Sequence, residues 1–108
     1  MAETDELLEA LRSPDWRVAA DAAEQLKSVP GERAARALAD ALDADDTAIT
    51  EAALESLLAR DEPYGADLSW AALTTLDDDL TMHIWGFLYP YPNHPITLEL
   101  KRRERARR

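Results

Sequence analysis

The sequence predicts an all-α protein: an α-α superhelix of three helical hairpins, followed by a proline-rich C-terminal extension. Apolar residues recur at the i, i+3, i+4 spacing that one buried helix face requires. The same pattern returns with a constant period of 31 residues, and paired helices at a fixed period are typical of an α-solenoid. Short segments with proline or glycine separate the periodic stretches.

The first hairpin is expected over about residues 5–29. In LEALRSPDWRVAADAAEQL, residues 8–26, the segment Ser13-Pro14-Asp15 divides two apolar stripes. Proline is tolerated in the first turn of a helix, and an acidic residue balances the positive end of the helix dipole. Two helices are therefore predicted, over about residues 4–12 and 15–28. The buried face of the second is expected to contain Val18, Ala19, Ala22, Ala23 and Leu26.

Two further copies of the pattern follow, over about residues 32–60 and 66–89. Leu7, Ala10, Leu11, Asp15, Val18, Ala22 and Leu26 correspond to Leu38, Ala41, Leu42, Asp46, Ile49, Ala53 and Leu57, then to Ser69, Ala72, Leu73, Asp77, Leu80, Ile84 and Leu88. Helices are predicted over about 32–43, 46–60, 66–76 and 78–88, with breaks at residues 30–31 and 62–65. The alanines let neighbouring helices approach closely. Ile84 and Trp85 replace the alanine pair in the last copy, as expected where larger side chains close the core of a terminal repeat.

The first copy resembles a known family. LLEALRSPDWRVAADAAEQL, residues 7–26, is similar to a HEAT-like repeat of the short bacterial kind that also occurs in phycobilisome lyase subunits. Its marks are Leu-x-x-Leu, Pro-Asp, Arg-Val, Ala-Ala and a closing Leu. The resemblance covers residues 5 to about 90, although Ala48 stands where the first copy has Arg17. It implies an armadillo-like solenoid in which the second helix of each hairpin lines a concave side.

The C-terminal segment departs from the repeat. YPYPNHP, residues 89–95, contains three prolines and cannot form a regular helix. Since Ile96, Leu98 and Leu100 alternate with polar residues, we expect an extended strap over residues 90–100. The basic sequence KRRERARR, residues 101–108, is expected to be a mobile tail.

The net charge of −10 is unevenly distributed. Residues 1–100 carry 21 acidic and 6 basic side chains, whereas residues 101–108 carry six basic and one acidic. An acidic body repels nucleic acid and anionic membranes and favours basic partners. An acidic start to the chain and the lack of an apolar run near ~20 residues indicate a cytoplasmic protein without a membrane partner.

Signals for chemistry are weak, so we expect no enzymatic activity, metal or cofactor. The chain has no cysteine, and His83 and His94 fall on different predicted elements. The run Asp77-Asp78-Asp79 is interpreted as a helix start, where carboxylates accept backbone N–H bonds, rather than as an acid–base pair.

The outward rows of the second helices give a candidate partner-binding surface. The 31-residue offset places five carboxylates and one arginine in these rows, which the resemblance implies line the concave side. Trp16 lies beside them and is expected either to face solvent or to pack over the turn. The predicted site residues are Trp16, Arg17, Asp21, Glu24, Glu51, Glu55, Asp79 and His83.

The expected function is therefore protein–protein recognition through an acidic concave face. The chain would act as an adaptor, or as an inhibitor of the kind found among immunity proteins, on a partner with a basic surface. The family that the chain resembles includes DNA glycosylases with cationic concave surfaces. The predicted concave surface of this chain is acidic, which argues against nucleic acid in the groove. Two alternatives stay open: a non-catalytic subunit resembling a lyase component, and a nucleic-acid mimic. A homodimer is a further possibility, because body and tail carry opposite charge.

Overall fold

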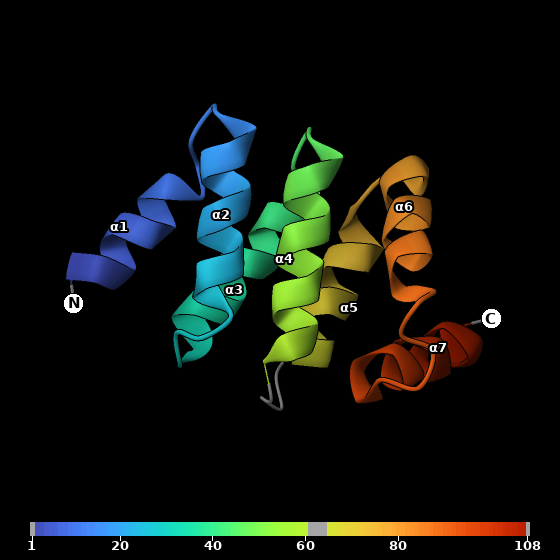
Figure 1. Ribbon diagram of the computed structural model, residues 1–108. Coiled ribbons are helices and arrows are strands. Elements are labelled where there is room, and N and C mark those ends of the chain that lie inside the picture. The colour runs from blue at the N-terminus through green and yellow to red at the C-terminus, as the bar shows by residue number, and fades with distance from the viewer. Residues whose placement is uncertain (1, 61–64, 108) are drawn as a thin grey trace.

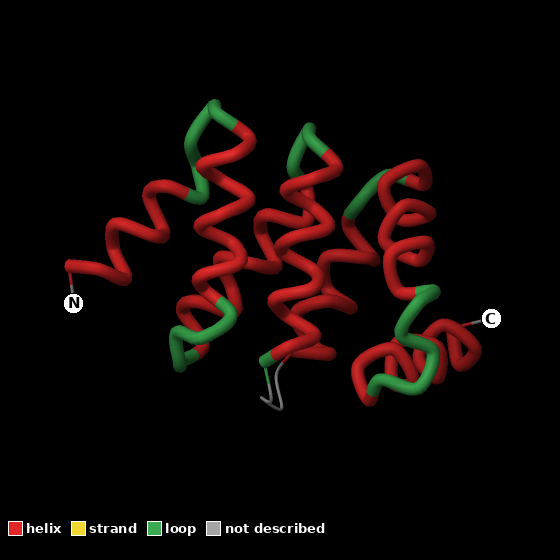
Figure 2. The backbone as a smooth tube through the Cα atoms, viewed as in Figure 1, coloured by secondary structure: helices red, strands yellow, loops and turns green. Residues whose placement is uncertain are grey.

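The computed structural model describes residues 2–60 and 65–107, and these form helices joined by turns, without any strand (Figure 2). The elements are α1 (Ala2–Ala10), α2 (Trp16–Leu26), α3 (Glu32–Asp40), the 3₁₀ turn η1 (Ala41–Asp43), α4 (Thr47–Ala59), α5 (Gly65–Thr75), α6 (Asp78–Leu88) and α7 (Pro95–Arg107). The predicted all-α class is confirmed. The break expected at 62–65 lies largely on residues 61–64, outside the described residues.

The helices form two layers in an elongated molecule of 43 × 26 × 23 Å (Figure 1). In one layer α2, α4 and α6 lie side by side, with α4 in contact with both neighbours. In the other layer α3 contacts α5, and α5 contacts α7. α1 lies at the N-terminal end, where it packs on α2 and α3. The central helix α4 therefore has neighbours on both sides.

Aspartates 31 residues apart begin the three helices of the first layer. The side chain of Asp15 accepts a hydrogen bond from the backbone N–H of Arg17 at 3.0 Å, and Asp46 accepts one from Ala48 at 2.8 Å. Asp77 accepts from Leu80 at 2.8 Å. Each carboxylate satisfies a donor that the first helical turn leaves unpaired. The predicted role of these aspartates at the helix starts is confirmed.

The repeat position occupied by an alanine pair in α2 carries larger side chains in α6. Ala19, Ala22 and Ala23 of α2 are buried, as predicted from their spacing. At the equivalent place in α6, Ile84 is buried and Trp85 is partly buried against the same core. Alanine allows close helix approach early in the chain, while bulkier residues fill the space near α6.

Val18 departs from the expected pattern. Its side chain is 44% exposed and lines a groove between α1 and α3, so its predicted burial is wrong. The equivalent residues Ile49 and Leu80 are half-buried. The difference lies in the neighbours: α2 has only the short helix α1 on its N-terminal side, whereas α4 is flanked by α2 and α6.

Polar side chains of α4 and its C-cap tie it to the end of α2. The Ser56 hydroxyl donates to the carbonyl of Ala23 at 2.8 Å. The buried Arg60 guanidinium donates to the carbonyls of Leu26, Val29 and Gly31, at 2.7 Å and 2.8 Å to the first and last. Gly31, the N-cap of α3, has a φ of +106°, a conformation that residues with a side chain rarely adopt. The predicted break at residues 30–31 is confirmed.

The expected extended strap and mobile tail are wrong, because residues 95–107 form the helix α7. Pro95 occupies the first helical position, where a missing N–H costs nothing and a fixed φ favours the helix. His94 precedes it and accepts a hydrogen bond from the Ile96 N–H through Nδ1 at 3.1 Å. A proline that predicts a break within a helix is thus compatible with the start of one.

The apolar face of α7 continues the 31-residue spacing. Its buried residues Ile96, Thr97 and Leu100 lie 31 positions beyond Gly65, Ala66 and Ser69 of α5, and 62 beyond Ala34, Ala35 and Leu38 of α3. α7 contacts α5 as α5 contacts α3. The approach is close at Gly65, where an added Cβ would come within 3.0 Å of Ile96 Cδ1. The repeat predicted to end near residue 89 therefore extends into α7.

Two basic residues of α7, Arg102 and Arg103, form ion pairs. The Arg103 guanidinium pairs with Asp67 of α5 and with Glu99, and Arg102 pairs with Glu99 at 2.7 Å. Hydrogen bonds from the two arginines lower the pKa of Glu99 to about 2. The hydrogen bond with Glu99 raises the pKa of Arg102, and the hydrogen bonds with Asp67 and then Glu99 raise the pKa of Arg103. The predicted tail is thereby docked on the body through Arg103.

Candidate partner-binding face

All eight predicted site residues are exposed, and all lie on the layer formed by α2, α4 and α6. We call this surface the acidic face: Trp16, Arg17, Asp21 and Glu24 of α2, Glu51 and Glu55 of α4, and Asp79 and His83 of α6. Because the three helices start at matching aspartates and lie side by side, residues 31 apart occupy equivalent places on neighbouring helices. One carboxylate position is repeated in this way, at Glu24 of α2 and Glu55 of α4.

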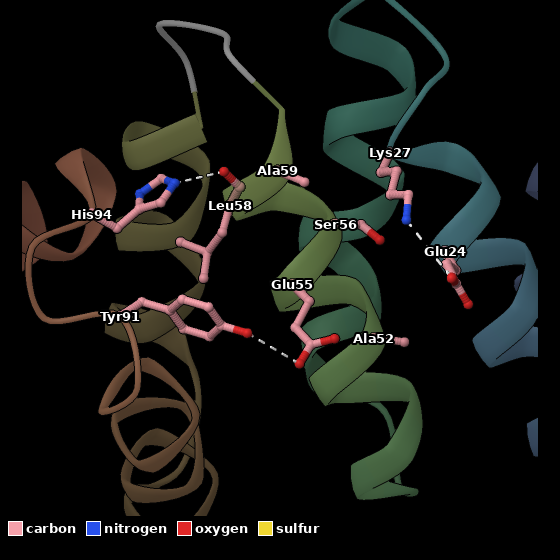
Figure 3. Close-up of a pocket in the computed structure, with 9 residues that line it drawn as sticks. All are labelled: Glu24, Lys27, Ala52, Glu55, Ser56, Leu58, Ala59, Tyr91 and His94. Carbon is pink, nitrogen blue, oxygen red and sulfur yellow. Dashed lines mark hydrogen bonds and ion pairs between the residues drawn. The ribbon is translucent and has the colours of Figure 1, made fainter.

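A groove of about 420 Å³ runs between α2 and α4 and is closed at one side by the segment after α6 (Figure 3). Its lining residues are Glu24, Lys27, Ala52, Glu55, Ser56, Leu58, Ala59, Tyr91 and His94. Carboxylates of two helices thus border a floor of small apolar side chains, with an aromatic ring at the edge. Of the eight predicted residues, the groove brings together Glu24 and Glu55.

The two carboxylates of the groove, Glu24 and Glu55, make only weak contacts within their own chain. Lys27 Nζ lies 3.7 Å from Glu24, with the two side chains 46% and 68% exposed. The Tyr91 hydroxyl donates to Glu55 across 3.5 Å. Exposed ion pairs contribute about 0–1 kcal/mol, and a hydrogen bond at the long limit of distance contributes little. Both carboxylates can therefore exchange these partners for a stronger external donor.

His94 connects the groove to α7. Its Nδ1 accepts from Ile96 N–H, so the neutral ring carries its proton on Nε2, which donates to the Leu58 carbonyl at 2.6 Å. One imidazole thus caps α7 and holds the preceding segment against the end of α4. Both ring nitrogens of His94 therefore have hydrogen-bond partners within the chain.

The N-terminal part of the acidic face is a separate cluster. The Arg17 guanidinium carbon lies 5.3 Å from the centroid of the Trp16 ring, within cation–π range. Trp16 is 45% exposed, so the ring faces solvent on one side. Asp21 accepts a hydrogen bond from Gln25 at 2.7 Å. None of these residues lines the groove at Glu24 and Glu55.

Sequence periodicity located the two carboxylates but missed the other polar groups of the groove. Lys27 is the C-cap of α2, and Tyr91 and His94 lie in the connection to α7, outside any helical period. Their one available signal was the Pro92–Pro95 pair, which marks a constrained segment near the end of the third copy. The two prolines indicate a constrained backbone, but they do not predict where the side chains of Tyr91 and His94 point.

Within residues 2–60 and 65–107, no three His, Asp or Glu side chains gather as metal ligands would. None of the helices in these ranges combines the length and apolar character needed to cross a bilayer. Compared with protein-family models, curated proteins and solved structures, the chain matches none. The geometry of the acidic face therefore carries the functional argument.

Proposed function

We propose that this chain is a short α-solenoid of the HEAT-like kind whose acidic face docks the basic surface of a partner protein, without catalysing a reaction. The carrying observation is the groove at Glu24 and Glu55, where carboxylates from neighbouring helices border an apolar floor. In the cytoplasm such a module would serve as an adaptor or as an inhibitor that covers a basic active site.

The repeat geometry supports the solenoid part of this proposal. Helices α2, α4 and α6 share cap positions 31 residues apart, and buried positions of α3, α5 and α7 follow the same period. Stacked hairpins with a constant period bury a continuous core and leave one row of helices available for binding. Function then depends on which side chains that row presents.

The chemistry of the groove favours arginine or lysine side chains. Their methylene groups can pack on Ala52 and Ala59, while the charged end reaches Glu24, Glu55 or the Tyr91 ring. A hydrogen bond to a charged group contributes about 1.5–3 kcal/mol, more than the exposed contacts it would replace. The other carboxylates of the face, Asp21, Glu51 and Asp79, would contact neighbouring basic residues of the partner.

Charge reversal on the face provides the test. The variant Glu51→Lys with Glu55→Lys should lower the affinity for an arginine-rich peptide at least ~10-fold at ~0.1 M salt, measured by fluorescence anisotropy. The matched control is Glu9→Lys with Asp40→Lys, which changes the net charge equally on α1 and α3. Both control residues lie near helix C-terminal ends, where lysine is tolerated.

Equal losses in the two variants would mean that net charge, and not the acidic face, attracts the peptide. The same variants then serve in affinity purification from the native host, where a protein partner should be retained by the control and lost by the Glu51/Glu55 variant. Binding that needs a chromophore or metal on the chain would instead favour the lyase-subunit alternative.

A further inference from the structure

The exposed side of α7 is a cationic stripe on an otherwise acidic chain. Leu98, Lys101, Arg102 and Arg105 follow the i, i+3, i+4, i+7 spacing of one helix face, and all four are exposed. The opposite side of the helix carries the buried residues that dock on α5. Leu98 is 49% exposed, so the stripe also presents an apolar side chain to solvent.

We propose that the cationic stripe of one copy docks on the acidic face of a second copy. This inference rests on the proposed function, since it assigns a particular basic occupant to the same face. The chain's own stripe is held on the body by Arg103 with Asp67 and by Ile96 against Gly65. While α7 is docked in this way, the stripe is available to the acidic face of another molecule.

The two surfaces match in charge and in size. Lys101 and Arg105 face Asp21, Glu24, Glu51 and Glu55, four exposed carboxylates on two neighbouring helices. Arg102 joins them by exchanging its exposed pair with Glu99. Residues 98 to 105 span about 10 Å along a helix at ~1.5 Å per residue, and packed helices such as α2 and α4 are ~8–10 Å apart. Leu98 can reach the apolar floor at Ala52 and Ala59.

The net charge of −10 sets the salt range in which this contact can form. Two copies repel each other over long distances, but at ~0.1 M salt the Debye length is only ~10 Å. Close opposite charges then act with little interference from the rest of each molecule. At ~0.5 M salt the exposed pairs of the contact are screened as well.

Sedimentation velocity on the full chain tests the proposal. At ~0.1 M salt the average mass should rise with protein concentration, and at ~0.5 M it should fall toward that of the monomer. Lys101→Glu with Arg105→Glu should raise the dissociation constant of self-association at least ~10-fold. The control Arg33→Glu with Arg36→Glu changes the net charge equally on α3 and should self-associate like the wild type.

Mixing provides the decisive measurement. The Lys101/Arg105 variant keeps an intact acidic face, while Glu51→Lys with Glu55→Lys keeps an intact stripe. Each should be a monomer alone, and the mixture should form a complex with one copy of each. A mixture that stays monomeric, or equal loss of association in the Arg33/Arg36 control, overturns the proposal.

Failure here is distinguishable from failure of the proposed function. A wild-type chain that stays monomeric but binds the arginine-rich peptide through Glu51 and Glu55 overturns only self-docking. If the stripe of such a monomer binds a glutamate-rich peptide, its occupant is a foreign acidic protein. Loss of both peptide binding and self-association in the Glu51/Glu55 variant, with the stripe variant losing only the latter, supports both proposals.

Discussion

At the scale of single residues, Arg60 joins two hairpins through backbone carbonyls. Its guanidinium donates to the carbonyls of Leu26, Val29 and Gly31, which lie between the C-terminal end of α2 and the start of α3. A planar group with five donors suits several carbonyls better than an ammonium does. The sequence alone places an arginine in solvent, so this burial could not be predicted from residue type.

Replacing Arg60 should therefore destabilise the protein strongly. Arg60→Met keeps much of the side-chain volume but removes the charge-assisted hydrogen bonds to the carbonyls of Leu26, Val29 and Gly31, and should lower the free energy of unfolding by roughly 2–4 kcal/mol. Arg36→Met, which removes an exposed pair with Glu32, should change it by less than about 0.5 kcal/mol. Urea unfolding followed by circular dichroism measures both, and equal effects would contradict the role given to Arg60.

His94 makes a second prediction at this scale. His94→Ala removes the cap of α7 and the hydrogen bond to Leu58, so the free energy of unfolding should fall by about 1–2 kcal/mol. His94→Asn should recover part of this loss, because asparagine is a good helix cap. His83→Ala, at an exposed place on α6, is the matched control and should have little effect in the same urea titrations.

At the scale of elements, α2, α4 and α6 were predictable and α7 was not. An aspartate cap followed by apolar residues at helical spacing leaves little choice of structure, and it occurs three times. For α7, the prolines suggested an extended chain, although Pro95 is compatible with a first helical turn. The 31-residue period does extend into α7, since Ile96 and Leu100 continue the positions of Gly65 and Ser69.

The candidate site was predictable to the same extent as its helices. Glu24 and Glu55 follow from the 31-residue offset, because equivalent places on stacked helices face the same side. Tyr91 and His94 reach the groove from a connection whose path depends on where α7 docks. That docking is set by contacts between distant residues, such as Arg103 with Asp67, which no local pattern reports.

The ion pairs of α7 predict a dependence on pH. The pKa of Glu99 is lowered from 4.5 to about 2 in the folded chain, so its charged form stabilises the fold above pH 4.5, and that contribution is lost as the pH falls toward 2. Glu99→Gln should therefore be less stable than the wild type at pH 7, and the difference should vanish near pH 2. Urea unfolding across this range measures it.

The control repeats the Glu99→Gln comparison in a chain that already carries Arg102→Gln and Arg103→Gln. Without the two arginines, the Glu99 replacement should no longer change the slope of stability against pH between 4.5 and 2. An unchanged slope difference would mean that the arginines are not the cause of the lowered pKa.

At the scale of the whole molecule, stability should fall from the centre toward the N-terminal end. α4 contains six buried residues and contacts α2 and α6, whereas Leu7 and Leu8 of α1 are only half-buried. Segments with few buried apolar contacts open locally at lower free energy than the global unfolding. Native-state hydrogen exchange should therefore show α4 amides protected at least ~100-fold more than those of α1.

The exposure of Val18 predicts how much α1 contributes to the stability of the whole chain. If Val18 is exposed because α1 covers α2 poorly, deleting residues 1–12 should lower the free energy of unfolding by only about 1–2 kcal/mol and leave α4 protection nearly unchanged. In a stack where each hairpin contacts only its neighbours, losing an end helix removes one interface and no more. Unfolding of the whole chain after this deletion would show instead that α1 is part of a single cooperative core.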